Sequence, residues 1–147
     1  MIIKTHFLIN DKECLCFVEK NIYGRNIEYN LDIFRLKTKI NDNGYENREN
    51  FDCMELAIRD LQKQLPYNFQ ICCCLSCRYG NFCPYGNAEN EIFCFIDYKP
   101  ESKDDVLNIF DVFSNDTEPN ELLYCCDKYQ KASIDYFNYN DWIYHFR

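Results

Sequence analysis

Several residue types on which enzymes depend are scarce in this chain of 147 residues. It contains four serines, two histidines and four glycines, and each glycine stands alone. A phosphate-binding loop needs clustered glycines and a hydrolase needs a serine on a sharp turn, and neither pattern is present. A lone histidine is more often structural than catalytic. The sequence therefore predicts a protein that is not an enzyme, with a cysteine–histidine pair formed by folding as the open alternative.

Long hydrophobic runs are also lacking. No segment reaches the roughly 18 apolar residues that a bilayer-spanning helix needs. The first residues, MIIKTHFLINDKECLCF, lack the basic start and continuous apolar stretch of a signal peptide. We therefore expect a cytoplasmic protein, in which the eleven cysteines are free thiols or metal-bound thiolates rather than disulfides.

Apolar and aromatic residues are abundant. Hydrophobic residues make up 47% of the chain and aromatic residues 17%, which is too apolar for a disordered protein. A chain of this length can bury one core of ordinary size without disulfides. With no internal repeat and no linker, residues 1–147 are expected to form one domain.

The periodicity of the apolar residues predicts an α+β fold with a largely antiparallel sheet and two amphipathic helices. Strands are expected over residues 2–9, 14–20, 27–40, 69–75, 91–98 and 121–129. The apolar set changes phase at Ile33-Phe34, which indicates a bulge there. A turn of about four residues joins the first two strands, and residues 41–50 read as a loop.

Two segments have the 3.6-residue period of helices. Residues 51–65 follow a D-x-x-E start at Asp52 and end at Pro66. A shorter helix follows Pro100, where Ser102 and Asp105 are spaced as a capping box. The aromatic tail, residues 134–147, has no clear period, and its conformation stays open.

Negative charge is concentrated in one segment. Between Glu89 and Asp127 there are eleven acids and two lysines, a net charge of −9, whereas the rest of the chain has thirteen acids and fourteen bases. Such a segment repels phosphate backbones and anionic lipids, which argues against nucleic-acid or membrane binding and for a basic protein partner. The alternative is a solvated surface that keeps the protein soluble. The residues expected to contact a partner are Glu101, Asp104, Asp105, Asp111, Asp116, Glu118 and Glu121.

Four cysteines have a spacing compatible with a zinc ribbon, in which thiolates from two chain segments surround one Zn²⁺ at about 2.3 Å. These are Cys74, Cys77, Cys83 and Cys94, spaced C-x2-C-x5-C-x10-C. A complete motif has a second C-x2-C pair, which this chain lacks. The other interpretation is that the thiols pack as small hydrophobic side chains.

The remaining cysteines are expected to serve packing. Neighbouring strand residues point to opposite faces, so neither Cys72-Cys73 nor Cys125-Cys126 can converge on one ion without distortion. Cys14 and Cys16 share a face, as any apolar stripe would.

The segment CLSCRYGNFCPYG and the following EIFCF resemble a pattern of small bacterial proteins, some of which are similar to immunity proteins of contact-dependent or polymorphic toxin systems. The resemblance covers residues 70–95, and Cys83 departs from it. It implies a small cytosolic antidote that blocks a toxin domain, often a basic nuclease, by covering its active site.

Two hypotheses follow. The first is a non-enzymatic binding protein, an immunity protein that neutralises a basic toxin domain through the acidic segment. The second is a zinc-stabilised structural or adaptor domain whose interaction surface lies near the loop from Cys74 to Cys94. An enzyme with a cysteine nucleophile is the third class.

Overall fold

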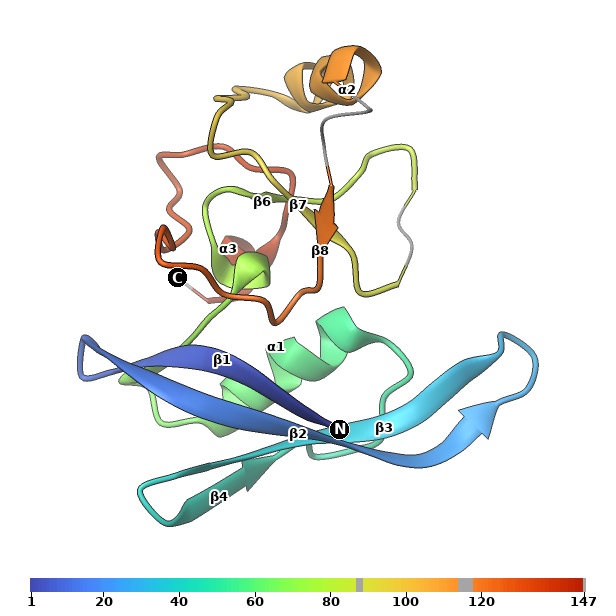
Figure 1. The fold of residues 1–147 in the computed structure, drawn as a ribbon, viewed down its shortest axis with the longest axis vertical. Helices are drawn as coiled ribbons and strands as arrows, with labels where there is room; N and C mark the ends of the chain where they lie inside the picture. Colours follow the sequence, from blue (N-terminus) through green and yellow to red (C-terminus); the bar gives the residue numbers. More distant parts are fainter. Residues whose placement is uncertain (87–88, 114–117, 147) are drawn as a thin grey trace. The chain divides into compact units, whose positions relative to one another are not determined.

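The computed structural model describes residues 1–86, 89–113 and 118–146, and its chain divides into two compact units (Figure 1). Unit 1 is Met1–Ile71 and unit 2 is Cys72–Arg147. The predicted α+β class with a largely antiparallel sheet and two amphipathic helices is confirmed. That residues 1–147 fold as one domain stays a prediction. Within the described residues, no helix is both long and apolar enough to cross a bilayer.

Unit 1 contains a five-stranded sheet and one helix. The strand order is β4-β3-β2-β1-β5, and the pairs β1–β2, β2–β3 and β3–β4 are antiparallel. The elements are β1 (Ile2–Ile9), β2 (Lys12–Asn26), β3 (Leu31–Ile40), β4 (Asn43–Glu46), α1 (Met54–Gln64) and β5 (Phe69–Cys72), the last of which ends in the first residue of unit 2.

Two tight turns set the register of this sheet. Asn10-Asp11 joins β1 to β2 and Asn41-Asp42 joins β3 to β4, and all four residues have positive φ angles between 51° and 66°. Two-residue hairpin turns of this type favour asparagine and aspartate, which tolerate such angles. The first turn is therefore shorter than predicted. The prediction of a loop over residues 41–50 is wrong for Asn43–Glu46, which form β4.

The predicted bulge lies on the partner strand. The register of β2 against β3 shifts between Ile22 and Gly24, whose partners are Phe34 and Ile33. The change of phase in the sequence thus marked the correct place in the sheet, but the extra residue is in β2. Strand β2 runs on to Asn26, whereas the predicted strand ended at residue 20.

The predicted first helix is confirmed as α1, which contacts β3 and β4. It begins at Met54 with no side-chain cap, so the predicted capping role of Asp52 is wrong; this carboxylate accepts a hydrogen bond from Asn26 Nδ2 at 3.5 Å instead. Its fully buried apolar residues have the spacing of one helical face: Met54, Ala57, Ile58 and Leu61.

Unit 2 contains a three-stranded sheet of very short strands, in the order β6-β7-β8 with both pairs antiparallel. Its elements are the 3-10 turn η1 (Cys74–Ser76), β6 (Gly80–Asn81), β7 (Ile92–Cys94), α2 (Lys103–Phe113), β8 (Pro119–Asn120) and α3 (Trp142–His145). The predicted strand over residues 121–129 is wrong. Leu122 and Leu123 are both buried there, which the alternating pattern of a half-buried strand does not allow.

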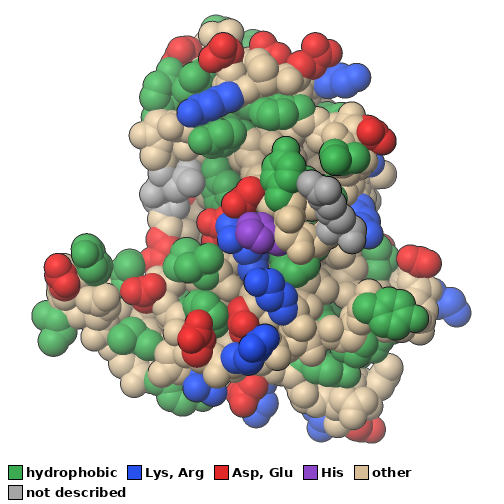
Figure 2. All heavy atoms as spheres, turned by 180° about the vertical axis from the view of Figure 1, so that it is seen from behind, with side chains coloured by type: hydrophobic (Ala, Val, Ile, Leu, Met, Phe, Trp, Pro, Cys, Tyr) green, Lys and Arg blue, Asp and Glu red, His purple; other side chains and the backbone are tan. Residues whose placement is uncertain are grey.

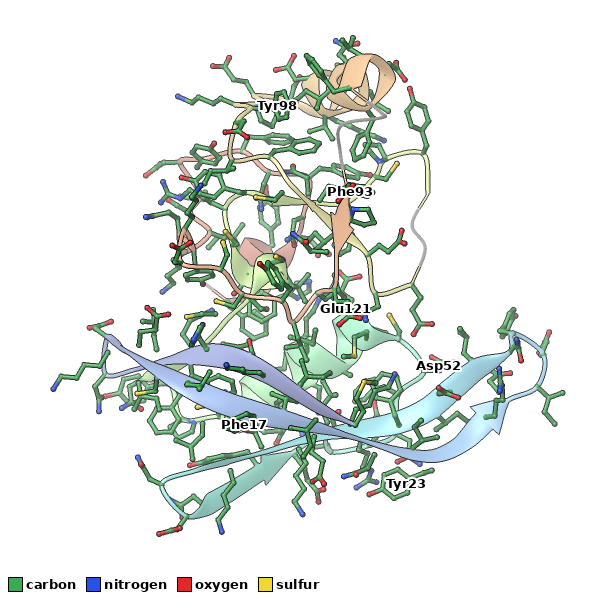
Figure 3. All side chains as sticks on the ribbon, in the orientation of Figure 1. Phe17, Tyr23, Asp52, Phe93, Tyr98 and Glu121 are labelled. Carbon is green, nitrogen blue, oxygen red and sulfur yellow. The ribbon has the colours of Figure 1, made fainter. Side chains whose placement is uncertain are left out.

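Helix α2 confirms the predicted second helix and its cap. The Asp105 N–H donates to Ser102 Oγ at 3.2 Å, and the Asp105 carboxylate accepts the Glu101 N–H at 2.8 Å. Beneath the helix, Phe110 packs against Phe93 with ring centroids 4.9 Å apart. Figure 3 shows Phe93 and Tyr98 on the side of unit 2 that carries α2. An aromatic cluster therefore holds the helix on the small sheet.

The turn from Cys74 to Gly80, here the cysteine turn, contacts several segments of unit 2. A Cβ atom added to Gly80 would lie 2.0 Å from the carbonyl oxygen of Cys74, so only glycine fits there. Asn138 Nδ2 donates to the Gly80 carbonyl at 3.0 Å, and Asn140 Nδ2 donates to the Leu75 carbonyl at 2.7 Å. The aromatic tail is thus mostly irregular chain tied to this turn by asparagine side chains.

Gly80→Ala is expected to lower the free energy of unfolding by about 1–3 kcal/mol, because the new methyl group must displace packed backbone. Urea unfolding followed by the fluorescence of Trp142, the only tryptophan, measures the loss in unit 2. Gly44→Ala is the matched control, since nothing lies within 4 Å of its added Cβ. Equal transition midpoints for the two variants would contradict the role of Gly80.

Candidate functional site

Four of the seven acids predicted to bind a partner lie on or beside α2, and they form what we call the α2 acidic surface. Its residues are Glu101, Asp104, Asp105 and Asp111, of which Asp105 is half-buried and the others are exposed. Figure 2 shows carboxylates (red) gathered over α2 at the top of the view, with basic side chains (blue) beside them.

The helix arranges these acids in two ways. Asp104, Asn108 and Asp111 are spaced four and three residues apart and share one exposed stripe. Asp105 caps the helix and is structural as well as charged. At the end of the stripe the Asp111 carboxylate accepts a hydrogen bond from Tyr85 Oη at 2.7 Å, which raises the pKa of the Tyr85 phenol.

The other predicted acids are separate from this group. Glu118 and Glu121 are exposed and flank β8, and Figure 3 shows the position of Glu121. Asp116 lies outside the described residues. The structure therefore divides the predicted binding residues between α2 and β8.

Unit 2 carries nearly all of the net charge. It has thirteen acids and six bases, a net charge of −7, whereas unit 1 has eleven acids and ten bases. The ion pairs His6–Glu13, Arg59–Glu55 and His145–Asp141 use no acid of the α2 acidic surface. The negative potential of α2 is thus not cancelled by direct contacts.

A cavity of about 360 Å³ lies next to Glu101 in unit 2. It combines two carboxylates, Glu101 and Asp135, with one lysine, Lys99. Its other walls come mainly from the C-terminal tail: Pro100, Ser133, Ile134, Tyr136, Phe137, Asn138, Asn140, Ile143 and Tyr144. The sequence did not predict this cavity, because an aromatic tail without a helical or strand period gives no sign of which residues meet.

The structure brings three of the four predicted zinc ligands to one region and leaves the fourth apart. Cys74 and Cys77 lie in the cysteine turn, and Cys94 is paired with Gly80 across β6 and β7. Cys83 packs instead against the aromatic cluster of Phe95, Val106 and Phe110. Within the described residues, no three His, Cys, Asp or Glu side chains are placed to hold an ion.

Burial makes several thiols weak acids. It raises the pKa of Cys73 to about 11 and raises the pKa of Cys74 still further. Burial raises the pKa values of Cys16, Cys77 and Cys94 as well. A nucleophilic cysteine needs a lowered pKa, so none of these five is activated for catalysis.

Compared with known proteins, the chain matches no family model, no curated protein and no solved structure.

In the presence of a chelator, the free energy of unfolding is expected to fall as the pH rises above about 8.5. The thiols of the unfolded chain then lose protons while the buried thiols of Cys73 and Cys74 keep theirs, so the unfolded state binds fewer protons and is favoured. Each such thiol adds a slope of about 1.4 kcal/mol per pH unit. Urea unfolding between about pH 7.5 and 9.5 measures it. Cys73→Ala should reduce the slope, and a slope unchanged in that variant would count against this origin.

Proposed function

We propose that the chain is a non-enzymatic binding protein that captures a basic protein partner on unit 2. The observation that carries the proposal is the α2 acidic surface. Three of its carboxylates lie on one helix and the fourth, that of Glu101, lies just before it, and the ion pairs His6–Glu13, Arg59–Glu55 and His145–Asp141 use none of them. Glu118 and Glu121 beside β8 supply further negative charge. A field of one sign speeds the encounter with an oppositely charged partner.

Apolar side chains next to these acids provide contacts that hold the complex. Val112 is 72% exposed, and Tyr85, which donates to Asp111, is 64% exposed. Phe113 follows at the end of the helix and is 36% exposed. Aromatic and aliphatic anchors of this kind contribute most of the binding energy at interfaces, while charges set the rate and the orientation.

The cavity beside Glu101 suits a basic side chain of the partner. Its carboxylates, Glu101 and Asp135, can pair with a lysine or arginine head group. The rings of Tyr136 and Tyr144 offer surfaces for the aliphatic stem and for a cation–π contact.

The specific form of the proposal is a cytoplasmic immunity protein that neutralises a basic toxin domain. Support comes from the acidity of unit 2, and the resemblance of residues 70–95 to proteins of that type suggested this form.

Co-expression with the toxin domain encoded beside the gene tests the biological role. Cells that produce both proteins are expected to survive a toxin that kills cells producing it alone. Death of the co-expressing cells, with the antidote present in soluble form, would sink the immunity proposal.

The double variant Asp104→Lys and Asp111→Lys tests the surface itself. At low salt it is expected to slow association with the basic partner roughly tenfold, because steering depends on the local field. Stopped-flow association rates measure the effect. Asp105 is left unchanged because it caps α2. The matched control is Glu28→Lys with Glu49→Lys in unit 1, which changes the net charge equally. Equal association rates for the two double variants would show that the acids of α2 do not steer the partner.

A further inference from the structure

The cysteine turn has the shape of a metal-binding half-site. The Cys77 N–H donates to the Cys74 carbonyl at 3.3 Å, and the Gly80 N–H donates to the Cys77 carbonyl at 3.0 Å. These bonds fold a C-x2-C pair into a tight turn closed by a glycine that cannot be replaced without a clash. Two cysteines on such a turn supply two of the four ligands in many structural zinc sites.

Strand β7 supplies a third thiol on the same side. Cys94 is the partner of Gly80, and Ile92, two residues before it, has its Cδ1 atom 3.0 Å from the Cβ position of Gly80. Because side chains alternate along a strand, Cys94 shares the face of Ile92, towards the cysteine turn. Phe93 and Phe95 face the aromatic cluster, where Cys83 packs. Cys83 and Cys94 are thus on opposite sides of β7.

The fourth thiol comes from the segment after β8. The Cys74 N–H donates to the Tyr124 carbonyl at 2.7 Å, and the Leu75 N–H donates to the Leu122 carbonyl at 3.2 Å. This pairing places Cys126, two residues after Tyr124, beside the cysteine turn. Neighbouring Cys125 is directed differently, because its thiol donates a hydrogen bond to the Cys126 carbonyl at 3.6 Å.

These four thiols form one electrostatic group. Burial affects the pKa of Cys74 most, followed by the charges of its chain neighbour Cys73 and of Cys77, Cys94 and Cys126. Cys126 also acts on Cys77 and on Cys94, and Cys77 acts on Cys94, so every pair in the set interacts. A divalent cation bound between the four sulfur atoms would hold them as thiolates. Asn120 Nδ2 also contacts Cys74 Sγ at 3.8 Å, as amides that support metal-bound thiolates do.

We propose that one structural zinc ion is bound by four thiolates, those of Cys74, Cys77, Cys94 and Cys126. Binding forms four Zn–S bonds, breaks four S–H bonds and releases four protons to the solvent. The set differs from the one expected from the sequence, because Cys126 takes the place of Cys83. The side chains as they stand do not form an ion site in the described chain. Zinc uptake therefore requires the thiols to turn about their Cα–Cβ bonds. Backbone pairing joins the cysteine turn both to β7 and to the segment after β8.

Cobalt titration of the full chain, purified under reducing conditions, tests the site directly. One equivalent of Co²⁺ is expected to bind with the charge-transfer and visible bands of a tetrahedral four-thiolate complex, and Zn²⁺ should displace it. Proton release during zinc uptake should make binding tighter as the pH rises. The absence of a tetrahedral cobalt spectrum would overturn the proposal.

Matched serine variants then identify the ligands. Cys126→Ser and Cys94→Ser are expected to lose the four-thiolate spectrum, whereas Cys125→Ser and Cys83→Ser should keep it. Loss in Cys83→Ser with retention in Cys126→Ser would overturn the proposed set and favour the one read from the sequence.

Alkylation of the unaltered protein tests the site even where the serine variants fail to fold. The chain is alkylated with and without zinc, and the modified cysteines are located by mass spectrometry of its peptides. Zinc should protect Cys94, which is exposed, and Cys126, while Cys14 in unit 1 reacts equally in both samples. Equal modification of Cys94 and Cys126 with and without zinc would contradict the site. The result does not depend on partner binding, so this proposal and the proposed function can fail separately.

Discussion

Unit 2 depends on the close approach of two backbone segments, Gly80 against the carbonyl of Cys74. Its strands have only two or three residues, so the sheet alone cannot provide a stable core. The cysteine turn compensates by acting as an anchor for the chain that follows. The tail reaches back to it through Asn138 and Asn140, and the segment after β8 pairs with it through backbone bonds. Irregular chain becomes ordered because its polar groups are satisfied at this turn.

Strand β7 connects this anchor with the proposed binding surface. One face of β7 carries Cys94 towards the cysteine turn, and the other carries Phe93, which packs against Phe110 of α2. Whatever fixes β7 therefore also fixes the helix that presents Asp104 and Asp111. A zinc-stabilised scaffold and a partner-binding protein, which the sequence left as rival hypotheses, are compatible in this arrangement. The metal would set stability, and the acids would set the rate of capture.

Sequence patterns predicted the elements whose signals are local. The helical spacing of α1, the capping pair Ser102 and Asp105 and the phase change opposite Gly24 were all readable. Asp52 does not cap α1, because the helix begins at Met54 with Cys53 in the capping position and Asp52 lies one residue too early. The proposed zinc ligands could not be predicted from the sequence, because Cys126 lies in irregular chain that has no periodicity. The cavity beside Glu101 could not be predicted for the same reason.

Native-state hydrogen exchange tests most directly whether the cysteine turn holds unit 2 together. The account predicts that the amides of Cys74, Leu75 and Gly80, which donate within unit 2, are among its slowest to exchange. It also predicts that Gly80→Ala accelerates amides throughout unit 2, including those of α2, and leaves β1 to β4 unchanged. Early exchange at the cysteine turn while α2 stays protected would contradict the account.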